Sequence, residues 1–484
     1  MSDHASGQQD RKSSGGAMWS AADFWVQQVS QLLTFVLVGN ILGPTVVGIM
    51  TMALVTTLFL ATFLENGFSD TLIQKAELRS DHFDTAFWLM LAIGGVEALV
   101  LLGLTPVIAW IFSEPQLKEI LPLMAIGLPF IGITACYTGV LQRQLKFRQL
   151  ATRSIFAYGS GFAVAFLLAR HGFGIYSLVG FFLVSRMVDA VLIIAVSGMR
   201  PGFHVTREAL AEIVDYGKHR VAHQAVTYFT SQFDRFIIGI FLGAHALGLY
   251  AIAERLVSAL VNGISGVFQR VAFPVLSARQ HDRPSFEEAV RNFLTAANLV
   301  SIPVFFGLAL TSDRLIAVLF TDNWSGVVPL MVVMCAVGLV HPSNYVLTAS
   351  TNALGYPQIV LKISVIVLVM RVVAGLIGAQ FNVMAVAMAN ASVYLLSLPV
   401  FLIVANDLYR GRWGYLFSGS WRPVLASCAM AFAVWPAGRF LSDQNEVVAL
   451  ASEVVIGAVS YAVAIKLLAP ALFEDALRMV LRRA

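Results

Sequence analysis

Polar and charged side chains recur at helical spacing within a segment that is otherwise strongly apolar. One helical face carries His219, His223, Thr227, Thr230 and Asp234, with Ser231 and Arg235 beside it. Hydrocarbon cannot satisfy such groups, so this face must turn toward protein or toward a water-filled cavity. The residue types could bind an anionic cargo through arginine and histidine, and could exchange a proton through aspartate.

Three further stripes of the same kind occur in the chain. They are Asp23, Gln27, Gln31 and Thr34; Thr62, Glu65 and Ser69; and Arg255, Ser258, Asn262, Ser265 and Gln269. The first stripe lies 200 positions before its counterpart around Asp234. We therefore expect four helices to line a central, hydrated and partly cationic cleft.

The stripes give a candidate site with two kinds of residue. We expect cargo contacts from Arg235, Arg255, His223, Gln27, Gln31, Ser231, Asn262 and Arg371, and coupling to a proton or sodium ion through Asp234, Glu65 and Asp23. Asp234 and Arg235 point about 100° apart on a helix, so each could instead form a structural ion pair with another span. Arg186 and Asp189 have the spacing of a local pair. His341 fits helix packing or the cavity equally well.

The composition is that of a membrane protein, because 58% of the 484 residues are hydrophobic and 12% are charged. The apolar runs predict fourteen spans, near 18–40, 45–67, 84–112, 119–141, 153–171, 174–197, 216–242, 246–277, 289–320, 326–350, 357–380, 383–405, 421–441 and 446–469. Residues 1–17 are predicted to be a disordered tail, with no signal peptide after it. Lysine and arginine collect on the side that holds both termini, which predicts a cytoplasmic N-terminus and C-terminus.

An internal repeat divides the chain into two halves. Gly39, Leu42, Gly43, Gly48 and Ala53 recur at an offset of 200 as Gly239, Leu242, Gly243, Gly248 and Ala253. Six spans separate the copies, so both halves enter the membrane in the same direction, as in transporters with parallel repeats. We expect an all-α membrane fold with six-helix lobes at 18–197 and 218–405. A cytoplasmic connector at 198–217 joins them, and two extra helices lie within 406–484.

Several function classes are not supported by the sequence. It contains no phosphate-binding G-x-x-x-x-G-K-[ST] loop and no HExxH or nucleophile-elbow motif. Cys136, Cys335 and Cys428 are far apart in apolar runs, so we expect no metal site and no cofactor. The outer loops are short, which argues against a membrane glycosyltransferase or polymerase and therefore against an enzyme. We expect no nucleic-acid partner.

Five stretches, in order, resemble one known family. They read GFSDTLIQKAELRSDHFDTAFWLML, LQRQLKFRQLATRS, HGFGIYSLV, FDRFIIGIFLGAHALGLYAIAERL and NALGYPQ, and they are similar to the polysaccharide-transport branch of the oligosaccharidyl-lipid flippase superfamily. The similarity covers roughly residues 18–405. The chain departs from many relatives at VGNIL, where Asn40 replaces an arginine.

The resemblance implies a V-shaped fold and a function. The expected function is translocation of undecaprenyl-pyrophosphate-linked oligosaccharides across the bacterial inner membrane, for exopolysaccharide, capsule or lipopolysaccharide synthesis. Arg235 and Arg255 would then contact the diphosphate or acidic sugars, membrane lipid would surround the chain, and a polysaccharide polymerase and a chain-length regulator would be partners. The alternative is a multidrug cation antiporter of the same superfamily. Arginine and histidine outnumber carboxylates on the seventh and eighth spans, which favours an anionic cargo.

Overall fold

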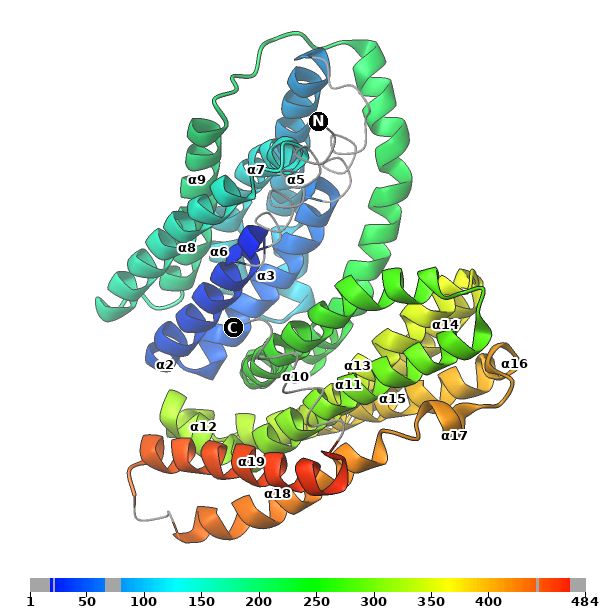
Figure 1. The fold of residues 1–484 in the computed structure, drawn as a ribbon. Coiled ribbons are helices and arrows are strands. Elements are labelled where there is room, and N and C mark those ends of the chain that lie inside the picture. The colour runs from blue at the N-terminus through cyan, green and yellow to red at the C-terminus, as the bar shows by residue number, and fades with distance from the viewer. Residues whose placement is uncertain (1–17, 21, 66–79, 441–443, 471–484) are drawn as a thin grey trace. The chain divides into compact units, whose positions relative to one another are not determined.

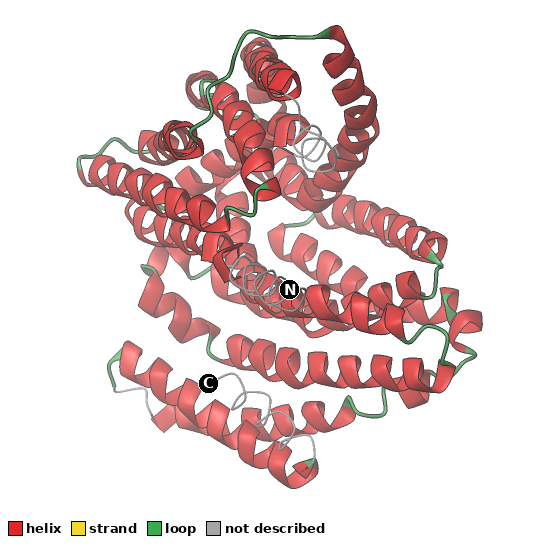
Figure 2. Cartoon of the chain, turned by 45° about the horizontal axis from the view of Figure 1, so that its top comes forward, coloured by secondary structure: helices red, strands yellow, loops and turns green. Residues whose placement is uncertain are grey.

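The computed structural model describes residues 18–440, apart from 21 and 66–79, and residues 444–470. Helices make up nearly all of this part of the chain, and no strand occurs in it (Figure 2). The chain forms two compact units, Met1–Gly248 and Leu249–Ala484. This all-helical architecture confirms the predicted fold class.

The first unit is built from long apolar helices in chain order. After the first helix, Met18–Leu42, they are α3 (Pro44–Glu65), α5 (Ser80–Ile111), α6 (Leu117–Ala125), α7 (Gly127–Arg143), α8 (Phe147–Arg170), α9 (Tyr176–Ser197) and the first part of α10 (Arg207–Ala278). The first helix contains a π-helical stretch, η1 (Thr34–Val38), followed by α2 (Gly39–Leu42). Helix α8 packs on α9, and α7 packs on both α5 and α9.

The second unit continues with the remainder of α10 and then repeats the pattern. It contains α11 (Arg283–Leu310), α12 (Ser312–Leu319), the short 3-10 turn η2 (Asp322–Trp324), α13 (Val327–Ala353), α14 (Pro357–Gly378), α15 (Val383–Val404), α16 (Asn406–Tyr409), α17 (Trp413–Leu416), α18 (Trp421–Phe440) and α19 (Glu446–Leu468). Within this unit, α18 lies beside α19 and packs on α11 (Figure 1).

Twelve helices in the described residues are long and apolar enough to cross a membrane. One of them, Thr227–Ala278, runs through a non-helical residue at Gly243 and has the length of two spans. Helix α18, with 20 residues, is a further span by length. Counted in this way, the helices agree with the predicted fourteen.

The repeat is visible in the backbone at its two glycine turns. Gly43 has φ +82° and ψ 171°, and Gly243 has φ +79° and ψ −177°. Side chains strongly disfavour this conformation, so glycine is required at both positions. Each glycine ends one membrane span and starts the next.

The same repeat produces a close helix crossing within the first unit. A Cβ atom built on Gly48 would lie 1.7 Å from the carbonyl oxygen of Ala244, and one on Gly248 would lie 1.9 Å from that of Pro44. Between these contacts, Thr45 Oγ1 lies 3.4 Å from His245 Nδ1, again at an offset of 200. The start of α3 and residues 244–248 of α10 therefore touch backbone to backbone, related by a local twofold axis.

The segment between α9 and α10 is docked onto α5. Asp84 accepts a hydrogen bond from the Gly202 amide at 2.9 Å, and Trp88 Nε1 donates to the Gly202 carbonyl at 2.8 Å. Trp88 also stacks on Phe203. The helix then begins at Arg207, within the expected connector 198–217, and continues into the membrane-spanning part of α10.

A buried carboxylate fixes the segment that leads to the last two helices. Glu287 of α11 is 2% exposed and binds Arg283 and Arg412, each at 2.8 Å. Next to it, burial raises the pKa of Tyr409, against the lowering effects of hydrogen bonds with Ser350 and Thr351 and of the Arg283 charge. The phenol therefore stays neutral and hydrogen-bonds to α13.

Candidate functional site

The polar stripe of the first helix faces α8 in the first unit. Asp23, Gln27 and Gln31 are all half-buried. Gln27 accepts a hydrogen bond from the Tyr158 hydroxyl at 3.3 Å. One carboxylate oxygen of Asp23 is buried and has no hydrogen-bond partner among the residues that the structure describes.

The second stripe lies on α10 before the turn at Gly243. Asp234 is 3% exposed, whereas Ser231 is exposed and Arg235 is half-buried. Arg235 Nη1 donates to Gln232 Oε1 at 2.6 Å, which holds the guanidinium along its own helix. The sequence places these ionic groups on a membrane-spanning helix, and the structure agrees.

Helix α3 positions this part of α10. The Tyr228 hydroxyl donates to the Val55 carbonyl at 3.0 Å, and its ring lies 6.0 Å from that of Phe59. Further along, Phe112 of the first unit lies 6.4 Å from Phe236, ring to ring. These contacts hold in place the part of α10 that carries Asp234 and Arg235.

In the second unit, two of the predicted residues follow on α10. Arg255 is half-buried and Asn262 is exposed. Ser265, on the same stripe, is 1% exposed, and its hydroxyl lies 3.2 Å from His341 Nδ1 on α13. The third predicted residue of this unit, Arg371 on α14, stacks over the ring of Tyr394 on α15, with Cζ 5.6 Å from the ring centroid.

These contacts assemble a polar group that we call the Tyr394 cluster: Ser265, His341, Arg371 and Tyr394. The His341 ring lies 6.3 Å from the Tyr394 ring, so a guanidinium and an imidazole flank the same phenol. Asn344 of α13 donates to Ser397 Oγ of α15 at 2.6 Å, which adds a second polar contact between the helices that carry His341 and Tyr394. Guanidinium, imidazole and phenol groups suit anionic oxygens and sugar hydroxyls. The ring that Arg371 contacts lies on another helix, so the spacing of residues along α14 could not reveal it.

Two predicted residues, His223 and Glu65, lie outside the residues whose side chains are described. No cluster of three or more histidine, cysteine, aspartate or glutamate side chains that could hold a metal ion occurs in the described part of the chain. Cys136 and Cys335 are buried and Cys428 is half-buried, all three as free thiols.

Two buried ion pairs are long-range in sequence. Asp189 binds Arg153 of α8, with 3.1 Å between Nε and Oδ1, so its partner is not limited to the expected Arg186. Arg186 also packs against the ring of Phe182, 5.7 Å from its centroid. In the second unit, Arg314 of α12 binds Glu453 of α19, with 2.9 Å between Nε and Oε1.

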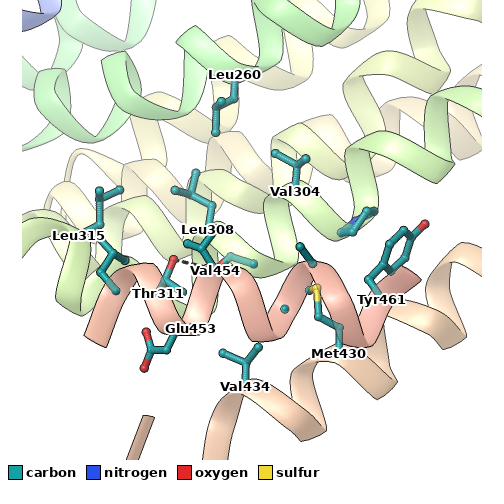
Figure 3. Close-up of a pocket in the computed structure, with 15 residues that line it drawn as sticks. Leu260, Val304, Leu308, Thr311, Leu315, Met430, Val434, Glu453, Val454 and Tyr461 are labelled. Carbon is teal, nitrogen blue, oxygen red and sulfur yellow. Dashed lines mark hydrogen bonds between the residues drawn. The ribbon is translucent and has the colours of Figure 1, made fainter. Parts of the chain in front are cut away.

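The second unit also contains a pocket of about 620 Å³ between α11, α18 and α19 (Figure 3). Its walls are mostly aliphatic, with Val304 and Leu308 from α11 facing Met430 and Val434 from α18. The polar lining residues are Thr311, Glu453 and Tyr461. Thr311 and Tyr461 donate to the carbonyls of Gly307 and Leu299, which leaves Glu453 as the ionic group in the lining.

Known proteins with similar sequences act in polysaccharide synthesis. Over 94% of this chain and 92% of the relative, the chain is 25% identical to the succinoglycan biosynthesis transport protein ExoT of Rhizobium meliloti. It is 27% identical to the teichuronic acid biosynthesis protein TuaB of Bacillus subtilis over 70% of this chain and 71% of the relative. The lipopolysaccharide biosynthesis protein WzxC of Escherichia coli is 21% identical over 90% of this chain and 89% of the relative.

A similar fold occurs in the solved structures of a flippase and of a transporter. The lipid II flippase MurJ in an inward closed conformation matches with a TM-score of 0.75 and 15% identity, covering 95% of this chain and all of that one. An inward-facing MATE transporter matches with a TM-score of 0.61 over 82% of this chain and 98% of that one. The family described as "Polysaccharide biosynthesis protein" matches residues 37–329, well over half of the chain. The chain is therefore a multi-pass membrane protein that belongs to the polysaccharide biosynthesis protein family.

Proposed function

We propose that the chain is a flippase that moves undecaprenyl-pyrophosphate-linked oligosaccharide across the bacterial inner membrane for exopolysaccharide, capsule or lipopolysaccharide assembly. The observation that carries the proposal is the match to a polysaccharide biosynthesis family over membrane helices that hold half-buried arginines. Intramembrane charges are costly and are kept mainly where an ion or a polar cargo must pass. An ATP-binding loop is absent from the sequence, so transport is secondary.

The proposed mechanism is alternating access between six-helix lobes. Arg235, Arg255, His223 and Arg371 neutralise the diphosphate or acidic sugars, while Gln27, Gln31, Ser231 and Asn262 hydrogen-bond to sugar hydroxyls. The polyprenyl tail stays in the lipid. Asp234, Asp23 and Glu65 bind the coupling proton or sodium ion, and release of that ion resets the carrier. Both chain ends lie in the cytoplasm, and the carrier acts beside a polymerase and a chain-length regulator.

Mass spectrometry of lipid extracts from a deletion strain tests the function. Loss of a flippase of this type leaves the lipid-linked repeat unit trapped in the membrane. A polyprenyl-linked oligosaccharide should therefore accumulate in the deletion strain and disappear when the gene is restored. A polymerase or transferase defect would instead change polymer chain length. Sensitivity to toxic cations without lipid-linked sugar accumulation would support the multidrug alternative and contradict the proposal.

A further inference from the structure

The pocket between α11, α18 and α19 has dimensions that match one leaflet of a membrane. Its lining on α19 runs from Leu450 to Tyr461, with Glu453 near one end and Tyr461 at the other (Figure 3). At about 1.5 Å per residue this stretch is about 16 Å long. The hydrocarbon core of a bilayer is about 30 Å thick, so each leaflet supplies about half of that. A single acyl chain lying along α19 would span the pocket.

Small residues on two of the pocket's helices create its space. Gly307 and Gly457 face the side chain of Met430, and a Cβ atom on either glycine would lie no closer than 3.4 Å to its nearest neighbour. Ala458 lines the same pocket and is exposed. The surrounding surface is apolar, since Val454, Val455 and Val459 on α19 are all more than half exposed. The pocket therefore opens on a surface that lipid covers.

The end of the pocket near Glu453 carries both signs of charge. Arg314 binds Glu453 at 2.9 Å, approaches Glu446 at 4.0 Å and donates to the carbonyl of Gly438. Glu446 is the first residue of α19, and its side chain is 53% exposed. The second oxygen of Glu453 has no hydrogen-bond partner among the described residues.

We propose that this pocket binds a zwitterionic phospholipid with a primary ammonium, such as phosphatidylethanolamine. One acyl chain lies along α19, the ammonium binds Glu446 and Glu453, and the phosphate binds Arg314. The mixed charges of Arg314, Glu446 and Glu453 suit a zwitterionic headgroup better than a diphosphate, which has no cation to offer the carboxylates. None of the residues that line this pocket is assigned to the cargo site, and the bound lipid would fill the space that α11 leaves beside the last two helices.

Lipid titration of the purified full chain, followed by native mass spectrometry, tests the site. Delipidated protein is titrated with phosphatidylethanolamine, phosphatidylcholine, phosphatidylglycerol and undecaprenyl phosphate in parallel. Phosphatidylcholine has no N–H donor and phosphatidylglycerol has no cation, so we expect phosphatidylethanolamine to bind about tenfold more tightly than phosphatidylglycerol, or about 1.4 kcal/mol. Phosphatidylcholine should fall between them.

Three variants test the contacts with the lipid headgroup and the contacts with the acyl chain separately. Glu446→Gln keeps the exposed position and should reduce the preference for phosphatidylethanolamine to about twofold, and Glu453→Gln should act in the same direction. Ala458→Phe fills the pocket without touching the ion pair, so it should weaken binding of all three phospholipids. Glu288→Gln, an exposed glutamate on the first turns of α11, is the matched control and should leave all affinities unchanged. Equal binding of the three phospholipids, stronger binding of undecaprenyl phosphate, or no effect of Ala458→Phe would overturn the proposal.

Discussion

Arg235 and Asp234 are adjacent on α10, yet their environments differ. Asp234 is 3% exposed, whereas Arg235 is half-buried and held by Gln232. If Arg235 binds the anionic headgroup and Asp234 carries the coupling ion, Arg235→Ala and Asp234→Asn should each reduce polysaccharide export at least tenfold. Export should be measured as surface polysaccharide per cell, with protein level in the membrane determined by immunoblot.

The control for these variants is Lys362→Ala, which removes an exposed basic side chain at the start of α14. It should export normally. Full export from both Arg235→Ala and Asp234→Asn would refute the roles assigned to them. Loss of protein from the membrane would show instead that these residues are structural.

The pair Arg153–Asp189 makes the second prediction at this scale. Both side chains are buried, and Arg153 also donates to Thr138 at 3.3 Å. Removing one partner leaves an uncompensated buried charge, which costs about 3–5 kcal/mol. Asp189→Leu and Arg153→Met should therefore each lower the melting temperature in detergent by several degrees. The double variant should recover most of the loss, and additive losses would contradict a direct pairing.

Single residues illustrate how far sequence alone can lead. The position of Asp234, Arg235 and Arg371 on membrane helices was predictable, because hydrophobic runs and helical periodicity are local properties. Their partners were not. Asp189, expected to pair with the nearby Arg186, also binds Arg153, 36 positions away, and Arg371 meets Tyr394 on another helix. Such partners depend on which helices pack together.

At the scale of elements, the crossing of α3 with residues 244–248 of α10 has no room for a side chain. Gly48→Ala and Gly248→Ala would each place a methyl group less than 2 Å from a carbonyl oxygen, so the helices must separate. We expect each variant to lower the melting temperature and to reduce export. Thermal unfolding in detergent and the export assay measure the two effects.

Gly159 of α8 and Gly266 of α10 are matched controls for this crossing, because a Cβ atom on either meets nothing within 4 Å. Alanine at these helical positions should be neutral or stabilise the protein by up to about 1 kcal/mol. If alanine at Gly48 and Gly248 changed the melting temperature and export no more than alanine at Gly159 and Gly266, the two helices could separate without loss of stability, and the prediction would be wrong.

The helices themselves were predicted to within a few residues, since each apolar run is bounded by glycine, proline or charge. The differences arise where tertiary contacts override local signals. Helix α10 begins at Arg207, because Asp84 and Trp88 hold the preceding segment against α5. The expected span 289–320 is divided at Thr311 into α11 and α12, and α12 carries Arg314 to Glu453. Neither effect is visible in periodicity.

At the scale of the whole molecule, the offset of 200 is both a sequence repeat and a structural one. Gly43 and Gly243 share a backbone conformation, and the contacts around Gly48 and Gly248 are mutual. Glycine spacing revealed the repeat because glycine marks positions that no side chain can occupy. Two of the helices around the apolar pocket, α18 and α19, lie outside the repeat, and the aliphatic lining of the pocket resembles any lipid-facing surface in sequence.

The proposed alternating access requires the crossing of α3 and α10 to open during each cycle. Thr45 and His245 lie side by side there, and both are exposed. A disulfide between Thr45→Cys and His245→Cys would hold the crossing closed, so export should stop under oxidation and return on reduction. Each single-cysteine variant should export under both conditions, which controls for the substitutions and for the native thiols. Normal export from the fully cross-linked protein would mean that this crossing is a permanent support, and the moving parts would then have to be sought elsewhere in the helices.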